Sequence, residues 1–418
     1  MSPFRFAIRL GLAALAVCAG FSASAIELRR GVNFELWQHW TSRSAFVAAD
    51  YDRTNFPDWS KAITDTQLAR LRAQGFDFVR LNVDPSPFFW IEADGNKLLD
   101  AVLTATRRLQ AADFKVIVDL HLVPDMDDRP NGLHWVLGTG DVKKPEGFAR
   151  YTALVGKVAG RLATLPADRT ALEVMNEPDQ DWFSHLALTD RWPEQLRTLH
   201  AAARAAAPQL PLILSGARGG DIDGLMRLDP GKITDDANVI WSFHYYEPYE
   251  ITHSGLPWES DARHFLVGLP FPAYRLDFGL EERLRLRARA AIDAEVSAAS
   301  ARAALYAKVD ETMTAFRAAK YGPDTIDAAF GRAAGWATDH GIAANRLLLG
   351  EFGVFQDHVA LDTRAAILAA MRQAAEAHGF AWAVYTAGLT QPNQSFSIIG
   401  DPATLAVEPE IATALGLR

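Results

Sequence analysis

The chain has 418 residues, of which 49% are hydrophobic and 22% charged, a composition typical of a globular protein. Its formal net charge of −9 argues against nucleic acid or an anionic membrane surface as the main partner. Cys18 is the only cysteine, and it falls in a segment that we expect to be removed. Disulfides, thiolate metal sites and cysteine nucleophiles are therefore excluded from the mature chain.

Residues 1–25 have the pattern of a secretory signal peptide. Arg5 and Arg9 precede the apolar run 10–21, and small residues at 23–25 supply a cleavage site. The run is too short to span a bilayer as a stop-transfer helix, and a retained anchor is the alternative. We expect export to the periplasm or the medium, and no membrane attachment after cleavage.

Short apolar segments alternate with amphipathic helical segments along residues 26–418. Several of the apolar segments lack a polar face, as parallel strands covered by helices do. The predicted strands are 31–36, 78–84, 115–121, 171–176, 211–215, 239–246, 347–352 and 381–386. Eight strands alternating with helices predict one α/β domain, a (β/α)8 TIM barrel. A doubly wound sheet is the alternative, but no GxGxxG motif follows the first strand.

Residues 247–345 interrupt this rhythm between the sixth and seventh predicted strands. A stretch rich in proline and aromatic residues comes first, and an Ala-, Arg- and Glu-rich helical stretch follows at about 280–319. We expect a largely helical insertion after strand 6, with a long loop and a long helix or hairpin, rather than a second domain. Its aromatic residues favour a lid or a binding wall.

Polar side chains end six of the eight predicted strands, at the edge where barrels of this kind carry their chemistry. They are Arg80, His121, Asn176 with Glu177, His244 with Tyr246, Glu351, and Trp382 with Tyr385. If strands 4 and 7 face each other across the barrel mouth, Glu177 and Glu351 can flank one glycosidic bond. Retaining glycosidases place two carboxyl groups about 5–5.5 Å apart for this purpose.

Seven segments occur in a fixed order between residue 30 and about 390: "RGVNFE", "VRLNV", "VIVDLH", "EVMNEP", "SFHYYEP", "LLLGEFGV" and "GFAWAVY". With them the chain resembles glycoside hydrolase family 5, the cellulase-type enzymes with catalytic glutamates on strands 4 and 7. The resemblance implies a barrel that hydrolyses β-linked polysaccharides with retention of configuration. It implies that Glu177 is the acid/base, Glu351 the nucleophile, and Asn176 the amide that holds the sugar 2-hydroxyl. It also implies a supporting polar shell made of Arg80, His121, His244 and Tyr246.

The implied roles set electrostatic requirements. Glu177 must carry a proton that it can donate to the leaving oxygen, whereas Glu351 must stay ionised to attack. A nearby cation such as Arg80 would lower the pKa of Glu351. A hydrogen bond from the Tyr246 hydroxyl would orient Glu351 and help to keep it charged.

One feature departs from the family pattern. The family usually has a tryptophan platform for the sugar three residues after the first aromatic of strand 8, and here Trp382 is followed at that spacing by Tyr385. Either Tyr385 stacks on the sugar or the subsite is reshaped. We also expect Trp37, in the loop after the first strand, to form part of a sugar subsite, because aromatic rings stack on the apolar faces of sugars.

We expect no metal and no cofactor. No spacing resembles HExxH or a Cys/His set. The acidic segment 125–132 suggests a calcium loop through Asp125 and Asp127. However, Arg129 occupies the third ligand position, and the glutamate that should end such a loop is absent.

The sequence thus predicts an exported, monomeric, retaining glycosidase that acts on a β-glucan or a related polysaccharide or oligosaccharide, resembling an endo-β-1,4-glucanase. A β-mannanase, an exo-β-glucanase or a β-glucosidase of the same family remains open. So does a non-catalytic sugar-binding barrel in exopolysaccharide processing, although such a barrel would need neither Glu177 nor Glu351. An α/β-hydrolase esterase is disfavoured because the sequence has no GxSxG elbow.

Overall fold

The computed structural model describes residues 26–35, 43–48, 63–91, 93, 95–125, 127, 130–138, 146–178, 191–256, 261–388 and 396–418. The predicted signal peptide and Trp37 lie outside these residues. Within the described part of the chain, we find no helix with both the length and the apolar character needed to cross a membrane.

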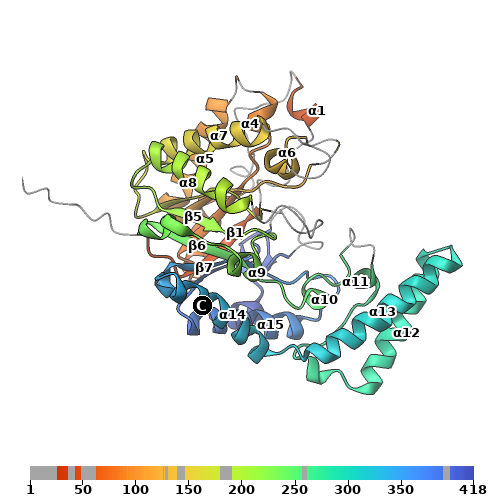
Figure 1. Ribbon diagram of the computed structural model, residues 1–418. Helices are drawn as coiled ribbons and strands as arrows, with labels where there is room; N and C mark the ends of the chain where they lie inside the picture. Colours follow the sequence, from red (N-terminus) through yellow and green to blue (C-terminus); the bar gives the residue numbers. More distant parts are fainter. Residues whose placement is uncertain are drawn as a thin grey trace, which may run out of the picture.

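Eight parallel strands form a closed barrel in chain order, with β1 hydrogen-bonded to both β2 and β8 (Figure 1). The strands are β1 (Arg30–Phe34), β2 (Phe78–Val83), β3 (Lys115–Leu120), β4 (Thr170–Glu173), β5 (Leu212–Ser215), β6 (Val239–His244), β7 (Leu347–Phe352) and β8 (Ala381–Val384). The predicted (β/α)8 barrel is therefore confirmed.

The inner face of the barrel changes from apolar to polar toward its carboxyl end. An apolar cluster includes side chains from six of the strands together with both alanines of β8: Phe78, Ile117, Ala171, Ile213, Ile240, Leu348, Ala381 and Ala383. Because strand side chains alternate between two faces, residues two positions further along point the same way. On β2, β3 and β4 these residues are Arg80, Asp119 and Glu173, so the apolar cluster supports a polar one.

Helices surround the barrel and carry the chain from strand to strand. The main ones are α3 (Asp65–Ala73), α5 (Gly95–Ala111), α7 (Glu146–Leu162), α8 (Trp192–Ala206), α9 (Ile222–Met226), α14 (Pro323–Asp339), α15 (Leu361–Ala377) and α16 (Pro409–Ala414). The N-terminus of α3 is fixed by a capping box, in which Thr64 and Gln67 each accept a backbone N–H of the other. Shorter elements complete the periphery: α1 (Arg43–Phe46), α4 (Pro87–Trp90), α6 (Leu133–Leu137), η3 (Gly231–Asp235), η5 (Ala344–Arg346), β9 (Ile399–Asp401) and β10 (Ala406–Val407).

The insertion after β6 contains α10 (Tyr249–Thr252), α11 (Ala262–Phe265), η4 (Ala273–Arg275), α12 (Phe278–Glu295) and α13 (Ala299–Ala319). Helices α12 and α13 pack together as a hairpin that projects away from the barrel (Figure 1). The predicted helical stretch is thus a hairpin. The predicted insertion, 247–345, extends too far, because α14 packs against α9 and α15 and belongs to the barrel's own ring of helices.

Candidate active site

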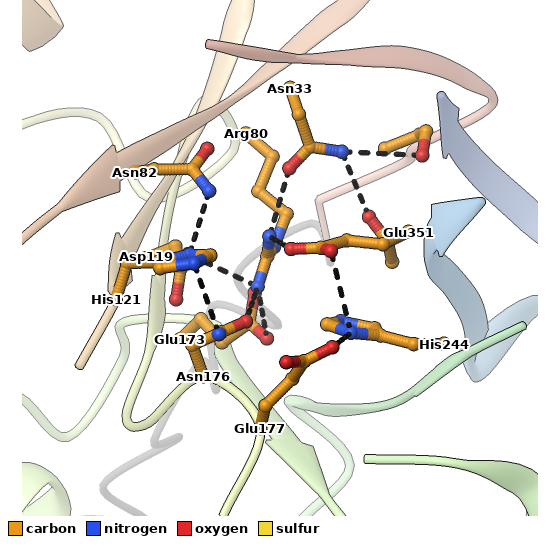
Figure 2. A network of polar contacts seen from close by, with 12 residues as sticks. Asn33, Arg80, Asn82, Asp119, His121, Glu173, Asn176, Glu177, His244 and Glu351 are labelled. Carbon is orange, nitrogen blue, oxygen red and sulfur yellow. Dashed lines mark hydrogen bonds and ion pairs between the residues drawn. The ribbon is translucent and has the colours of Figure 1, made fainter. Parts of the chain in front are cut away.

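Arg80 on β2 lies at the centre of a buried polar network at the barrel mouth (Figure 2). Its guanidinium donates to Glu351 Oε1 at 2.5 Å, to Glu173 Oε2 at 2.7 Å and to Asn176 Oδ1 at 2.8 Å. Asp119 Oδ2 lies 3.1 Å from Nη2. Burial alone would lower the pKa of Arg80, but Asp119, Glu173 and Glu351 raise it well above its ordinary value. A fixed positive charge is therefore held between strands 2, 3, 4 and 7.

Glu351, at the end of β7, is buried and ionised. Its Oε1 accepts from Arg80, and its Oε2 accepts from the Tyr246 hydroxyl at 2.9 Å. Burial favours the neutral acid, but the charges of His244, Arg80 and His121 outweigh it and lower the pKa of Glu351 to about 2. A carboxylate that stays charged at neutral pH, with both oxygens oriented, can act as a nucleophile.

Glu177 lies just beyond β4 on the solvent side of Glu351. Its side chain is 39% exposed, and its Oε1 lies 2.7 Å from His244 Nδ1. Its φ is +37°, a left-handed conformation that non-glycine residues rarely adopt. One carboxylate oxygen of Glu177, one of Glu351 and a ring nitrogen of His244 all lie within 4.8 Å of one another (Figure 2).

Glycine and irregular pairing between β6 and β7 make room for this arrangement. The register shifts next to His244 on β6, and a second shift in β7 falls between Leu349 and Phe352. A Cβ atom on Gly350 would lie 2.3 Å from Ser242 Oγ and 3.2 Å from His244 Nε2. The absence of a side chain at position 350 therefore lets the imidazole lie beside Glu351.

His121 and Asn176 support the other side of the site. His121 Nδ1 lies 2.6 Å from Asp119 Oδ2, and His121 Nε2 lies 3.1 Å from Asn176 Nδ2. Burial would lower the pKa of His121, but the charge and hydrogen bond of Asp119 raise it. Asn176 is thus held by both His121 and Arg80, which fixes the orientation of its amide.

The structure brings seven of the predicted site residues into one contiguous network: Arg80, His121, Asn176, Glu177, His244, Tyr246 and Glu351. Sequence reasoning missed further buried polar residues at the inner face, among them Asn33, Glu35, Asn82, Asp119 and Glu173. Each is a polar side chain within or directly after an otherwise apolar strand. That pattern is the signal that would have found them.

The prediction for Trp382 was wrong. Ala381 and Ala383 face the barrel interior, so Trp382 between them points outward. Its ring packs edge-on against Phe76 and Phe352, at centroid distances of 6.4 and 5.8 Å, where it cannot touch a substrate in the mouth. Tyr385 has the inward parity, and its hydroxyl is hydrogen-bonded to Glu35.

Two groups of side chains bear on cation binding. Glu177, His244 and Glu351 could each offer a ligand atom, but the Arg80 guanidinium already contacts Glu351 and disfavours a second cation there. Asp125, from the predicted acidic segment, accepts the backbone N–H groups of Gly132 and Trp135 at 2.9 and 3.0 Å. Its carboxylate therefore holds the start of α6.

A family model described as "Cellulase (glycosyl hydrolase family 5)" matches residues 40–388. The chain belongs to glycosyl hydrolase family 5. It is 23% identical over 239 residues to cellodextrinase A of Ruminococcus flavefaciens, covering 56% of this chain and 62% of the relative. It is 27% identical over 206 residues to a probable glucan 1,3-beta-glucosidase A of Aspergillus terreus, covering 46% and 45%. The chain thus spans about half to three fifths of the length of these curated relatives.

Solved structures show the same fold. An endoglucanase superposes with a TM-score of 0.61 at 19% identity, covering 93% of this chain and 96% of the other. The cellulose synthase subunit Z of Clostridioides difficile superposes with a TM-score of 0.59 at 18% identity, covering 93% and 99%. At these identities the likeness shows the barrel fold and nothing further.

Proposed function

We propose that this family 5 chain hydrolyses β-glycosidic bonds of a β-glucan or a glucan oligosaccharide with retention of configuration. The observation that carries the proposal is the approach of the Glu177 and Glu351 carboxylate oxygens to within 4.8 Å. Inverting enzymes separate their carboxyl groups by about 6.5–9.5 Å to admit a water, whereas retaining enzymes hold them about 5–5.5 Å apart. The short separation favours direct attack by one of the two.

In the first step, Glu351 attacks the anomeric carbon while the proton of Glu177 passes to the leaving oxygen, and the glycosidic bond breaks. In the second, the Glu177 carboxylate takes a proton from water, the water oxygen bonds to the anomeric carbon, and Glu351 leaves. Arg80 and His244 stabilise the charge that returns to Glu351, and Tyr246 keeps its orientation.

The unequal burial of the two carboxyl groups fits these roles. The Glu351 side chain is 5% exposed, while the Glu177 side chain is 39% exposed. Leaving groups and water reach the site from solvent, so the more exposed carboxyl is the one suited to exchange protons with them.

The names of two relatives, a cellodextrinase and a glucan 1,3-beta-glucosidase, support a β-glucan chain, and a short one, as the substrate. Release of single sugars or cellobiose from glucan oligosaccharides is the expected result. A ladder of long products from a polymeric glucan would instead favour endo-action, and preferential cleavage of mannan oligosaccharides would favour a β-mannanase.

Two variants test the mechanism. Glu351→Ala should lower hydrolysis of an aryl β-cellobioside by roughly 10⁴–10⁶-fold, and azide should restore turnover with an α-glycosyl azide as product. Glu177→Gln should lower cleavage of substrates with poor leaving groups by about 10²–10⁴-fold, and azide should yield the β-glycosyl azide. Glu295→Gln, on the exposed hairpin, is the matched control. Undiminished turnover in either active-site variant would reject the assignment.

Export is a second part of the proposal, and it rests on the pattern of residues 1–25. Expression of the full chain in a bacterial host should give a periplasmic or extracellular protein that begins at Ile26. The measurement is N-terminal sequencing and intact mass of the fractionated protein. A cytoplasmic product that retains residues 1–25 would contradict it.

A further inference from the structure

Glu35 is a buried carboxyl group at the mouth of the barrel that the proposed mechanism does not use. It directly follows β1, and its exposed fraction is 5%. Side-chain alternation along β1 places Glu35 on the same face as Asn33, whose Oδ1 accepts from Arg80 Nη1 at 2.8 Å. Asn33 therefore belongs to the Arg80 network, and Glu35 lies one step closer to the open end.

Within the described part of the chain, Glu35 has a phenol as its hydrogen-bond partner. Tyr385, just past the end of β8, shares a hydrogen bond with the Glu35 carboxyl group. The Tyr385 ring packs edge-on against Phe396 at a centroid distance of 5.8 Å, and the same Phe396 packs at 5.8 Å against Tyr246, which holds Glu351. One aromatic ring thus supports both the nucleophile's hydrogen-bond donor and the partner of Glu35.

Glu35 also lies within electrostatic reach of the reacting groups. Burial raises the pKa of Glu35 to about 7, the Tyr385 hydrogen bond and the charge of His121 oppose the rise, and Glu351 adds to it. Arg80 already binds Glu351, Glu173 and Asn176, whereas among the described residues Glu35 has the neutral Tyr385 hydroxyl as its hydrogen-bond donor. A hydrogen bond from Tyr385 uses one of the carboxyl group's two oxygens and leaves acceptor sites on the other.

We propose that Glu35, held in place by Tyr385, accepts a hydrogen bond from a hydroxyl group of the sugar whose anomeric carbon Glu351 attacks. This makes Glu35 a specificity-determining residue that selects sugars with a hydroxyl at one defined ring position. The inference rests on the proposed glycosidase function and extends it to a contact on the β1–β8 side of the site. A hydrogen bond between a sugar hydroxyl and a buried carboxylate discriminates strongly against an analogue that lacks the hydroxyl, because the carboxylate is then left unpaired.

The test changes the protein at residue 35 and the substrate at one hydroxyl, singly and together, so that the coupling between the two changes can be measured. Aryl β-glycosides are deoxygenated in turn at each hydroxyl of the sugar that carries the aryl group, and kcat/KM is measured for the wild-type chain, Glu35→Gln and Glu35→Ala. We expect deoxygenation at one position to lower kcat/KM of the wild type by about 10–100-fold, and that of Glu35→Ala by less than about 3-fold. Deoxygenation at each of the other positions should lower kcat/KM of all three proteins by the same factor. The proposal would be overturned if, at every position, deoxygenation lowered kcat/KM by the same factor in the wild type and in both variants.

Glu35→Gln keeps the side-chain volume, so it remains informative if Glu35→Ala fails to fold. A second readout is the pH dependence of binding of the product sugar to the wild type. Among the described residues, Tyr385, His121 and Glu351 act on Glu35, and its ionised form is the better acceptor. The Kd of the product sugar should therefore fall as pH rises through about 7, and Glu35→Gln should remove this pH dependence. A pH dependence of Kd that persists unchanged in Glu35→Gln would count against the proposal.

Failure of this inference is distinguishable from failure of the proposed function. A wild-type chain that hydrolyses aryl β-glycosides, loses activity in Glu351→Ala and shows no coupling to Glu35 rejects only the role of Glu35. A wild-type chain whose turnover is unchanged in Glu351→Ala rejects the glycosidase mechanism itself.

Discussion

The barrel mouth and the helical hairpin each contain a cluster of arginine and carboxylate groups, in opposite environments. At the mouth, Arg80 binds Glu173 and Glu351, and the side chains of all three are at most 5% exposed. On the hairpin, Asp310 binds Arg285 and Arg289 at 3.0 Å, with exposed fractions between 26% and 42%. The chemistry of the ion pairs is the same, and only their access to water differs.

That difference decides what each cluster can do. Water screens the hairpin pairs, so each contributes little to stability. At the mouth the charges have been removed from water, and each group depends on the others to remain ionised. The charged residues of the hairpin can therefore be replaced at little cost in stability, whereas the buried charges at the mouth are arranged so that a reaction can use them.

The largest effect is expected from Arg80→Met. It leaves Asp119, Glu173 and Glu351 buried without their cation, which should lower the free energy of unfolding at pH 7 by about 3–5 kcal/mol and abolish hydrolysis. Without Arg80, the pKa values of Glu173 and Glu351 should rise, because the charge of Arg80 lowers both. The penalty for burying these charged groups is then present at high pH and is relieved as they take up protons, so the deficit should shrink as pH falls.

Urea unfolding of Arg80→Met and wild type between pH 4 and pH 8 measures this deficit. Arg80→Lys is the matched control, because it keeps the charge but cannot span the three carboxyl groups. A deficit independent of pH would show that lost packing, and not uncompensated charge, accounts for the effect.

The next largest effect is expected from substitutions that compare the outer and inner faces of β8. Trp382→Leu removes a ring packed between Phe76 and Phe352, and it should lower the free energy of unfolding by about 2–4 kcal/mol while kcat and KM stay unchanged. Tyr385→Leu, three residues further and on the inner face, should instead lower kcat/KM. Thermal unfolding and steady-state kinetics on both variants make the comparison. A raised KM in Trp382→Leu would reinstate it as a site residue.

The positions of the barrel strands could be predicted from sequence to within a few residues, because buried parallel strands are continuous apolar runs. The same property concealed the orientation of their side chains. With both faces of β8 buried, no alternation of apolar and polar residues marks which one points inward, so Trp382 was assigned to the wrong face. Hairpin and barrel helices are both alanine-rich, so the sequence did not show that α14 belongs to the ring.

The polar network could be predicted only in part. Glu177 and Glu351 stand at strand ends next to proline and glycine, where their position reveals them. Asp119 and Glu173 lie inside the apolar strands β3 and β4. The role of each depends on its ion pair with Arg80, which lies on another strand, β2. Pairings between residues about 40 to 90 positions apart are set by the closure of the barrel, and a local pattern does not contain them.

A smaller effect is expected from Tyr246→Phe. It removes one hydrogen bond to Glu351 and leaves Arg80 and His244 in place, so kcat should fall by about 10–100-fold. The pKa of Glu351 should rise from about 2, because a donor to the charged form is lost. The acid limb of the kcat/KM profile should accordingly move to higher pH.

The measurement is a pH–rate profile with an aryl β-glycoside. Tyr245→Phe is the matched control, since Tyr245 is adjacent in sequence but packs edge-on against Phe330 on the outer face. An acid limb that stays in place in Tyr246→Phe would mean that Arg80 and His244 alone determine the ionisation of Glu351.

The smallest effect is expected from Asp310→Asn on the hairpin. It removes the negative charge shared by Arg285 and Arg289, but because all three side chains are partly hydrated, the free energy of unfolding should change by less than about 1 kcal/mol. Even that change should diminish in high salt, whereas the Arg80→Met deficit should persist, since buried charges are screened far less than exposed ones. Unfolding at low and high ionic strength, with kcat/KM as the second readout, tests the contrast. A loss of activity in Asp310→Asn would show that the hairpin communicates with the mouth, and the two regions could then no longer be treated as independent.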